Sequence, residues 1–319
     1  MHYRRLGKSG IKVSEISLGS WITFGDQIDD NTAIELTRSA YEAGINFFDC
    51  ADAYAKGRAE EVLGKAVAGL ARETLIISSK VFFPTMEGVN GRGLSRKHIT
   101  ESIHGSLRRL NLDYLDIYFC HRHDPDTTVE EVVQTMDILI RQGKILYWGT
   151  SEWDAFRLSQ AFSFARANGL IPPAVEQPRY SLMQRQRVEL DIADLVQEYG
   201  LGLTTFSPLY YGILSGKYNQ GIPPGSRATL EDMAWVKDRI TPPVIGQVKE
   251  LTALAGDLGA TTAQLAIAWI LRRKQVSSVI TGATRLEQLD ENLGAADLLE
   301  QLDDEALERV DALFPLAHD

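Results

Sequence analysis

The sequence is poor in cysteine and lacks long apolar or basic stretches. Its 319 residues include two cysteines, Cys50 and Cys120, which are too few for a disulfide framework and lack the spacing of metal ligands. No run reaches the ~18 apolar residues of a membrane span, and no apolar segment follows the charged N-terminus as in a signal peptide. The net charge of −10, with no long basic run, argues against a nucleic-acid surface. We therefore expect a cytoplasmic protein that neither inserts into membranes nor binds nucleic acid.

Linkers, repeats and a Rossmann fingerprint are also missing. No Pro-, Gly- or Ser-rich linker and no fixed-period repeat divides the chain, so we predict one domain over residues 1–319. No G-x-G-x-x-G follows a predicted strand, which leaves a Rossmann dinucleotide site unsupported. Gly7-Lys8-Ser9 lacks the earlier glycine of a P-loop and indicates a hairpin turn.

What the chain does contain is an alternation of strand-like and helix-like segments. Short, apolar, β-branched runs predict buried parallel strands at 16–19, 45–49, 75–80, 115–120, 145–150, 174–177, 203–207 and 278–282. Helical patterns lie between them, for example at 31–43, 95–110, 128–142, 155–167 and 188–198. Ser95 can cap the second of these helices, and Thr128 with Glu131 forms a capping box for the third.

Strands that alternate with helices predict either a doubly wound sheet or a closed barrel. The count of eight, at about 30 residues per unit, favours a (β/α)8 TIM barrel. A hairpin pattern precedes the first strand. The long segment Leu209–Pro243, rich in Gly and Pro, follows the seventh strand and is more typical of a functional lid than of a packing element.

Polar residues gather where the predicted strands end. In such barrels the active site lies at the carboxyl ends of the strands. The strand-end residues are Asp49, Lys80, His121, Ser151, Gln177, Ser207 and Thr284. Loops are polar in general, but packing does not require a polar ring at the ends of seven apolar runs.

The residues near the second and third strand ends indicate acid–base chemistry. Asp49 needs a partner for its charge, and Lys80 on the neighbouring strand can supply it. A phenol such as Tyr54 ionises near pH ~10, but a lysine cation about 4 Å away stabilises the phenolate by about 4 kcal/mol at an effective dielectric of roughly 20. That stabilisation lowers the pKa by up to about three units. We expect Tyr54 to titrate near neutrality as a general acid, with His121 orienting the substrate oxygen.

Other interpretations of the same residues remain open. Taken singly, a tyrosine here commonly packs, a lysine pairs with a carboxylate and a histidine is structural. Lys80 could instead be the nucleophile of a Schiff-base aldolase. His121 and His123 could suggest a metal hydrolase, but the other histidines do not fall on strand ends, which leaves too few ligands, and we expect no metal. Those other histidines are His2, His98, His104 and His318.

The sequence resembles the aldo-keto reductases, and among them the group that includes the β subunits of voltage-gated potassium channels. The resemblance runs from Arg5-Leu6-Gly7-Lys8-Ser9-Gly10 to Glu291-Asn292. The blocks that carry it are Phe47-Phe48-Asp49-Cys50-Ala51-Asp52-Ala53-Tyr54, Glu61-Val62-Leu63-Gly64, Ser79-Lys80, Tyr147-Trp148-Gly149-Thr150-Ser151, Glu176-Gln177, Phe206-Ser207-Pro208-Leu209 and Gly212-Ile213-Leu214-Ser215-Gly216-Lys217-Tyr218.

This resemblance implies NADPH-dependent reduction of an aldehyde or ketone. Hydride would pass from the nicotinamide to the carbonyl carbon while Tyr54, in a tetrad with Asp49, Lys80 and His121, delivers the proton. The loop after the seventh strand would cover the cofactor. The implied cofactor-binding residues are Trp21, Ser151, Glu152, Gln177, Phe206, Ser207, Pro208, Leu209, Gly212, Lys217, Arg227, Gly282, Thr284, Gln288, Glu291 and Asn292.

Within this set the resemblance separates three parts of the cofactor. Ser151 and Gln177 would hold the nicotinamide carboxamide, and Lys217 with Arg227 would reach the adenosine phosphates. The pyrophosphate contacts would be Ser207, Leu209 and Gly212, and the adenosine-end segment Gly282, Thr284, Gln288, Glu291 and Asn292. Candidate substrate contacts on the loops are apolar and aromatic, which favours an aromatic or aliphatic carbonyl compound over a highly charged one: Trp21, Phe82, Phe83, Met86, Trp153 and Tyr211.

The chain departs from the pattern of many reductases at several positions. Glu152 stands where Asn is common, and a carboxylate can accept but cannot donate a hydrogen bond. Gly282 and Gln288 stand where Lys and Arg often meet the 2′-phosphate. His121 stands where mammalian channel β subunits have Asn, which favours a working reductase. The alternative is a cofactor-binding regulatory subunit of a potassium channel with little turnover, tetrameric by resemblance.

Overall fold

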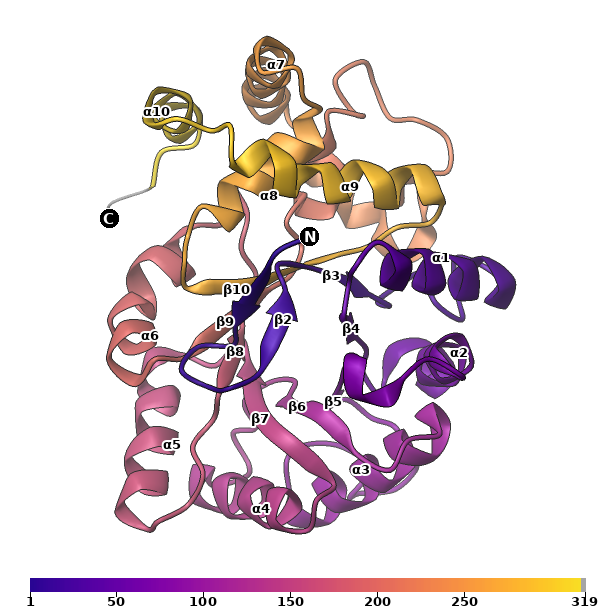
Figure 1. Ribbon diagram of the computed structural model, residues 1–319, viewed down its shortest axis with the longest axis vertical. Coiled ribbons are helices and arrows are strands. Elements are labelled where there is room, and N and C mark those ends of the chain that lie inside the picture. The colour runs from indigo at the N-terminus through magenta and orange to yellow at the C-terminus, as the bar shows by residue number, and fades with distance from the viewer. Residues whose placement is uncertain (317–319) are drawn as a thin grey trace.

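A closed barrel of eight parallel strands forms the centre of the computed structural model, which describes residues 1–316. Around the ring the strands follow the order β10-β3-β4-β5-β6-β7-β8-β9. Helices surround the strands (Figure 1). The predicted (β/α)8 barrel is therefore confirmed. The barrel strands are β3 (Ile16–Gly19), β4 (Phe47–Asp49), β5 (Ile76–Val81), β6 (Leu115–Cys120), β7 (Ile145–Ser151), β8 (Val175–Gln177), β9 (Gly202–Thr205) and β10 (Val276–Thr281).

The helices follow the strands along the chain. They are α1 (Asp30–Glu42), α2 (Arg58–Val67), α3 (Arg96–Leu110), α4 (Val129–Arg141), α5 (Ala155–Ala167), α6 (Ala193–Tyr199), α7 (Pro242–Asp257), α8 (Thr262–Leu271), α9 (Leu286–Leu299) and α10 (Asp304–Leu313). Each predicted strand corresponds to a barrel strand, with no boundary displaced by more than two residues. The predicted helix at 188–198 differs, because the chain forms a π-helical turn, Arg187–Asp191, before α6.

The predicted helix caps are present, with one difference. The hydroxyl of Ser95 accepts a hydrogen bond from the backbone N–H of His98, and that of Thr128 accepts one from Glu131. The carboxylate of Glu131 does not return to Thr128; it accepts from the backbone N–H of Arg96, 2.8 Å away. The capping box therefore forms only half, and its acidic side chain joins α4 to the start of α3.

The N-terminal hairpin closes one end of the barrel. β1 (Tyr3–Arg5) and β2 (Lys12–Ser14) pair antiparallel and lie across the barrel mouth in Figure 1. Leu6 and Val13 are fully buried in one apolar cluster with barrel-strand residues, among them Phe47, Ile76 and Val175, the first residues of β4, β5 and β8. The backbone N–H of Lys8 also donates to the carbonyl of Gly200 at 2.8 Å. This closure leaves the carboxyl ends of the strands as the open face.

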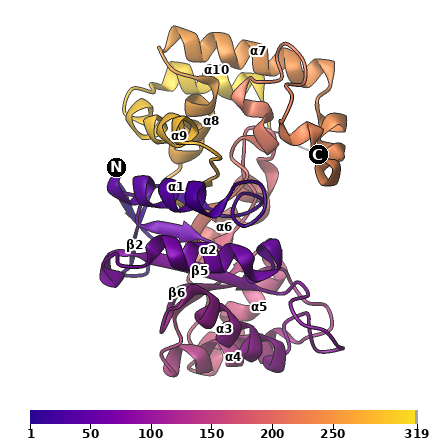
Figure 2. The same cartoon turned by 90° about the vertical axis from the view of Figure 1, so that its right-hand side faces the viewer.

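Two helices lie outside the barrel layer at the C-terminal end of the chain. α7 and α10 stand beside each other beyond α8 and α9 (Figure 2), and the side chain of Gln247 donates to the carbonyl of Leu313 at 2.7 Å. Within residues 1–316 no single helix is long and apolar enough to cross a membrane. α7 and α8 reach that length and apolarity only together, with a bend of 87° between them.

Leu6 belongs to the hairpin that closes the amino end of the barrel, which we call the plug. Its replacement by Ala should lower the free energy of unfolding by about 2–5 kcal/mol, because a buried leucine leaves a cavity when truncated. Urea denaturation measures this change. The same substitution at Leu190, whose side chain is 43% exposed, serves as the control and should change stability by less than ~1 kcal/mol. Equal effects at the two positions would contradict the role of the hairpin as a plug.

Candidate active site

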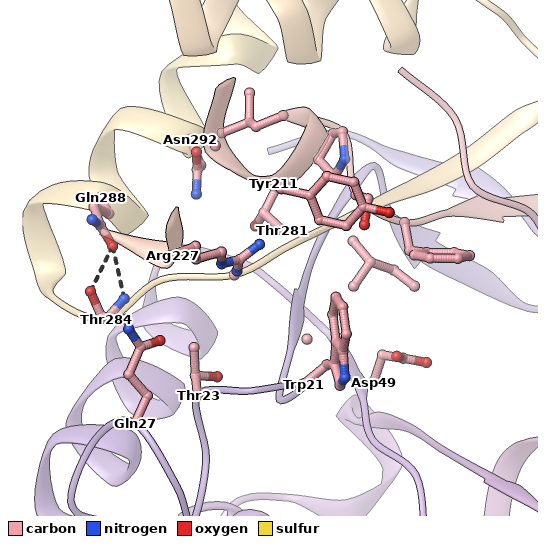
Figure 3. Close-up of a pocket in the computed structure, with 18 of the residues that line it drawn as sticks. Trp21, Thr23, Gln27, Asp49, Tyr211, Arg227, Thr281, Thr284, Gln288 and Asn292 are labelled. Atoms are coloured by element: carbon pink, nitrogen blue, oxygen red, sulfur yellow. Dashed lines mark hydrogen bonds between the residues drawn. The ribbon is translucent and has the colours of Figure 1, made fainter. Parts of the chain in front are cut away.

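A cavity of about 900 Å³ opens at the carboxyl ends of the barrel strands. It is within the size range of cofactor and substrate pockets. Figure 3 shows Trp21 and Asp49 at one end, Thr284 and Gln288 at the other, and Arg227 between them. Its wall includes the loop that follows β9, which contains short 3-10 turns at Tyr210–Ser215 and Arg227–Thr229. The predicted functional loop therefore forms one side of the cavity.

The structure brings nearly all the predicted site residues to this cavity. Of the predicted catalytic and cofactor-binding residues, only Lys80 and Glu152 are not part of its lining. Lys80 is fully buried behind the wall. Glu152 turns away: its carboxylate accepts from the backbone N–H of Arg179 at 2.7 Å and lies 3.7 Å from the guanidinium of Arg187.

A buried ion pair lies at the catalytic end of the cavity. Lys80 Nζ is 2.5 Å from Asp49 Oδ2 and also donates to the carbonyl oxygen of Cys50 at 2.7 Å. The second carboxylate oxygen of Asp49 accepts from the Ser78 hydroxyl at 2.8 Å and from the Gln177 amide at 3.0 Å. The partnership expected between Asp49 and Lys80 is present, with every charged group hydrogen-bonded.

Lys80 stays charged in this environment. Burial lowers the pKa of its ammonium, but the net pKa is raised, chiefly by the charge and the hydrogen bond of the Asp49 carboxylate. A Schiff-base lysine must be neutral to attack a carbonyl. The protonated, ion-paired amine is thus poorly suited to the aldolase alternative and well suited to supply positive charge.

Tyr54 lies beside that charge, but its pKa moves in the direction opposite to our expectation. Lys80 Nζ is 4.9 Å from the centre of the Tyr54 ring. Burial raises the pKa of Tyr54 to about 12, because the loss of hydration of the phenolate outweighs the lowering by Lys80, and Asp49 adds to the increase. The prediction of titration near neutrality is corrected: the phenol holds its proton at pH 7.

A strained turn presents Tyr54 to the cavity. The residue begins a short turn, Tyr54–Gly57, in which Ala55 and Lys56 have φ values of 46° and 55°. The left-handed conformation costs about 1–2 kcal/mol for a residue with a Cβ atom. Such strain commonly persists where the surrounding structure fixes a functional group, and here it fixes the backbone immediately after the phenol.

His121 completes the group as a neutral imidazole. It is 6% exposed, and its ring lies 5.7 Å from that of Tyr54 and 5.0 Å from that of Phe83, both edge-to-face. Burial, together with the cations Lys80 and Arg122, holds the pKa of His121 well below its usual value. A neutral imidazole carries one N–H donor and one acceptor, so it can donate to a carbonyl oxygen.

The residues predicted to bind a carboxamide lie next to this group. The Ser151 hydroxyl donates to the backbone carbonyl of Gln177 at 2.9 Å, and the Gln177 amide is hydrogen-bonded to Asp49. Ser151 and Gln177 both line the cavity. At the far end the Gln288 side chain accepts from the backbone and the hydroxyl of Thr284, at 2.9 and 3.0 Å (Figure 3).

Cations gather toward the adenosine end proposed from sequence. Lys217 and Arg227 both line the cavity, and no carboxylate among the described side chains lies within 4.0 Å of either. Burial by surrounding atoms and the neighbouring Arg227 and Arg285 lower the pKa of Lys217. A Cβ atom on Gly212, at φ 89°, would come 2.7 Å from Lys217 Nζ. Glycine at position 212 therefore leaves room for the ammonium in its present position.

Sequence reasoning missed three arginines in the cavity wall. Arg122 follows His121 directly, Arg179 comes two residues after Gln177, and Arg285 follows Thr284. Each stands just beyond a strand end, so the rule that located the polar ring could have located them too.

No three His, Cys, Asp or Glu side chains in the described part of the chain are grouped to hold a metal, and His318 lies outside that part.

Comparison with known proteins agrees with this geometry. The family model of the aldo/keto reductases matches residues 15–314, and the chain belongs to the aldo/keto reductase family. Two similar proteins are each named "Probable voltage-gated potassium channel subunit beta". The rice protein (Oryza sativa subsp. japonica) is 45% identical over 98% of this chain and 96% of its own length. The Arabidopsis thaliana protein is 45% identical over 98% of this chain and 97% of its own length.

Family membership gives the chain an oxidoreductase character, and this family generally uses a nicotinamide cofactor. The resemblance recognised in the sequence, both to the family and to the channel β-subunit group, is confirmed.

The buried carboxyl group of Asp52, on the segment that leads to Tyr54, should make stability depend on pH. Burial and the neighbouring Glu60 raise the pKa of Asp52 to about 8. A raised pKa in the folded state favours the protonated form, so the stability from this group is full below its unfolded pKa near ~4 and is lost as pH rises through about 8. Asp52→Asn should therefore melt higher than wild type at pH 9.

The measurement is the difference in Tm between variant and wild type at pH 6 and at pH 9. We expect the Asn variant to gain at least ~2 °C relative to wild type between these pH values, the shift that ~1 kcal/mol produces in a large domain. Use of the difference removes the contribution of other titrating groups. An equal change of Tm with pH in both proteins would contradict the raised pKa.

Proposed function

We propose that the protein is an NADPH-dependent reductase of aldehydes and ketones. The observation that carries this proposal is one cavity lined at one end by Tyr54, the neutral His121 and Asp49, which is ion-paired to Lys80 behind the wall, and farther along by Lys217 and Arg227. The first group can protonate a carbonyl oxygen, and the two cations can bind phosphates.

The donor set fits a nicotinamide dinucleotide. Lys217 and Arg227 would hold the adenosine phosphates, Ser207, Leu209 and Gly212 would contact the pyrophosphate through backbone and hydroxyl donors, and Ser151 with Gln177 would hold the carboxamide. The remaining predicted contacts line the same cavity, apart from Glu152. When bound, the cofactor supplies the hydride.

The chain's own residues then manage the proton. Tyr54, protonated at neutral pH, donates its phenolic proton to the carbonyl oxygen. Lys80 stabilises the phenolate that remains, and Asp49 keeps the lysine in place. His121, whose own ring packs edge-to-face with those of Tyr54 and Phe83, donates a hydrogen bond to the same oxygen and orients it. Because the pKa of Tyr54 is above neutral, the Lys80 charge acts chiefly on the phenolate as it forms.

A second candidate function comes from the names of the relatives. The rice and Arabidopsis proteins are both named as probable voltage-gated potassium channel β subunits, and the similarity covers nearly their whole length. On that basis the chain would bind the cofactor, assemble as a tetramer on a channel and turn over little substrate. Cofactor binding with no reduction of any aldehyde by the wild-type protein would favour this function over the reductase.

Tyr54→Phe should lower kcat/KM for reduction of 4-nitrobenzaldehyde by NADPH about 10²- to 10⁴-fold, the usual contribution of a general acid. NADPH binding, followed by fluorescence titration, should change little. Tyr41→Phe removes a hydroxyl that bonds Thr74 away from the cavity and serves as the matched control. Full activity in the Tyr54 variant would remove the phenol from the mechanism.

Lys217→Gln and Arg227→Gln should each weaken NADPH binding by about 10- to 100-fold, the loss of one charge-assisted hydrogen bond. The same substitutions should weaken the binding of NADH, which lacks the 2′-phosphate, by a smaller factor. Fluorescence titration with both cofactors measures the two dissociation constants. Lys97→Gln, at an exposed ion pair with Glu101, is the control. Tighter binding of NADH than of NADPH by wild type would contradict the phosphate role of these cations.

A further inference from the structure

Two guanidinium groups stand in the cavity wall near the acid–base group, and the reduction proposed above does not use them. Arg122 and Arg179 both line the cavity, on segments that follow β6 and β8. We propose that they form a binding subsite for an anionic group on the carbonyl substrate. The preferred substrates are then aldehydes or ketones that carry a carboxylate or a phosphate. This inference rests on the proposed reductase function and specifies its substrate class.

Arg122 is fixed where it can meet a substrate held by His121. Its guanidinium donates to the backbone carbonyl of His121 and to the hydroxyl of Ser151, the latter at 3.3 Å. It also lies 5.8 Å from the centre of the Phe83 ring, whose edge faces His121. These contacts use one terminal nitrogen of the guanidinium and leave other donors for a ligand.

Within residues 1–316, the side chain of Arg179 makes no hydrogen bond or ion pair. Its guanidinium carbon lies 5.3 Å from the ring centre of Phe206 and 5.6 Å from that of Tyr211. Its Nε atom is buried and has no hydrogen-bond partner among the described residues. The Glu152 carboxylate accepts its hydrogen bond from the backbone N–H of Arg179 and not from the guanidinium. A buried donor with no partner is costly, and an anion in the cavity would remove that cost.

The nearby carboxylates are engaged elsewhere. Glu152 bonds the backbone of Arg179 and lies beside Arg187. Glu176 bonds Arg187 at 3.1 Å and accepts from Thr150. Burial lowers the pKa of Arg122, the carboxylates of Glu152 and Glu176 raise it, and the charge of Arg179 lowers it further. The two guanidinium groups are therefore near enough to act on one another, and an anion in the cavity would be attracted by both.

This subsite is separate from the cations assigned to the cofactor. Arg227 and Arg285 act on the pKa of Lys217, whereas Arg179 acts on the pKa of Arg122. Arg122 is tied to His121 and Ser151 at the catalytic end. Of the apolar and aromatic residues expected to contact the substrate, Trp21, Phe83 and Tyr211 line the cavity, and Phe82, Met86 and Trp153 are not part of its lining. The substrate suited to both features has an apolar body and an anionic end.

The test compares two aldehydes of nearly equal size: 4-carboxybenzaldehyde, an anion, and 4-formylbenzamide, its neutral counterpart. With NADPH, wild type should show a kcat/KM at least about tenfold higher for the carboxylate, as one charge-assisted contact provides. Arg179→Gln should raise KM for the carboxylate about 10- to 100-fold and leave the amide within about threefold. Arg179→Lys should recover part of the difference. Arg309→Gln, at an exposed pair with Asp257, is the matched control.

Arg122→Gln is the second variant, and it should also raise KM for the carboxylate more than KM for the amide. The outcomes separate this inference from the reductase proposal. If neither aldehyde is reduced by wild type, the reductase proposal fails. If both are reduced equally well and Arg179→Gln changes both equally, the reductase stands and the anion subsite is wrong. A weakening of NADPH binding in Arg179→Gln as large as its loss of carboxylate affinity would also overturn the inference, because the arginine would then serve the cofactor.

Discussion

The ion pair between Lys80 and Asp49 is the interaction on which the site depends. Removal of an ammonium and a carboxylate from water costs several kcal/mol for each ion, and their attraction offsets this only when the remaining hydrogen-bonding atoms are satisfied. Here Ser78, Gln177 and the carbonyl of Cys50 satisfy them. The barrel makes this arrangement possible, since Asp49 is paired with Ser78 on the neighbouring strand and Lys80 lies on the same face two residues further.

The two ends of the barrel divide stability from function. At the amino ends, Leu6 and Val13 of the hairpin fill the mouth with apolar side chains. At the carboxyl ends the backbone is strained instead. The non-glycine residues with positive φ are nearly all in loops on that side: Ile22, Ala55, Lys56, Glu152, Ser207, Tyr210 and Tyr211, against Asn111 at the end of α3. Strain is tolerated there because the closed, packed end supplies the stability.

Much of this architecture could be predicted from the sequence, because strands buried on both faces are short, β-branched runs and their polar ends mark one face of the barrel. The same logic located Asp49, Lys80 and His121. Three features could not be predicted. The pKa of Tyr54 depends on how completely the fold removes water, which residue identities do not reveal. The direction of the Glu152 side chain depends on a left-handed backbone, φ 59°. The π-helical turn before α6 has no distinct periodicity.

The cavity is lined mainly by positively charged side chains, although the chain as a whole is negatively charged. The net charge is −10, yet the lining contains several arginines and a lysine, while one of its carboxylates, Asp49, is already ion-paired. Local fields in a cleft, more than net charge, govern which ligands accumulate there, so this cavity attracts anions.

The cations in and behind the cavity wall have different roles. Lys80 is buried out of reach of any ligand, so its charge stays available for the Tyr54 phenolate. Arg122 and Arg179 are open to the cavity, so a bound anion would neutralise them, and only a cation held behind the wall can support proton transfer regardless of what is bound.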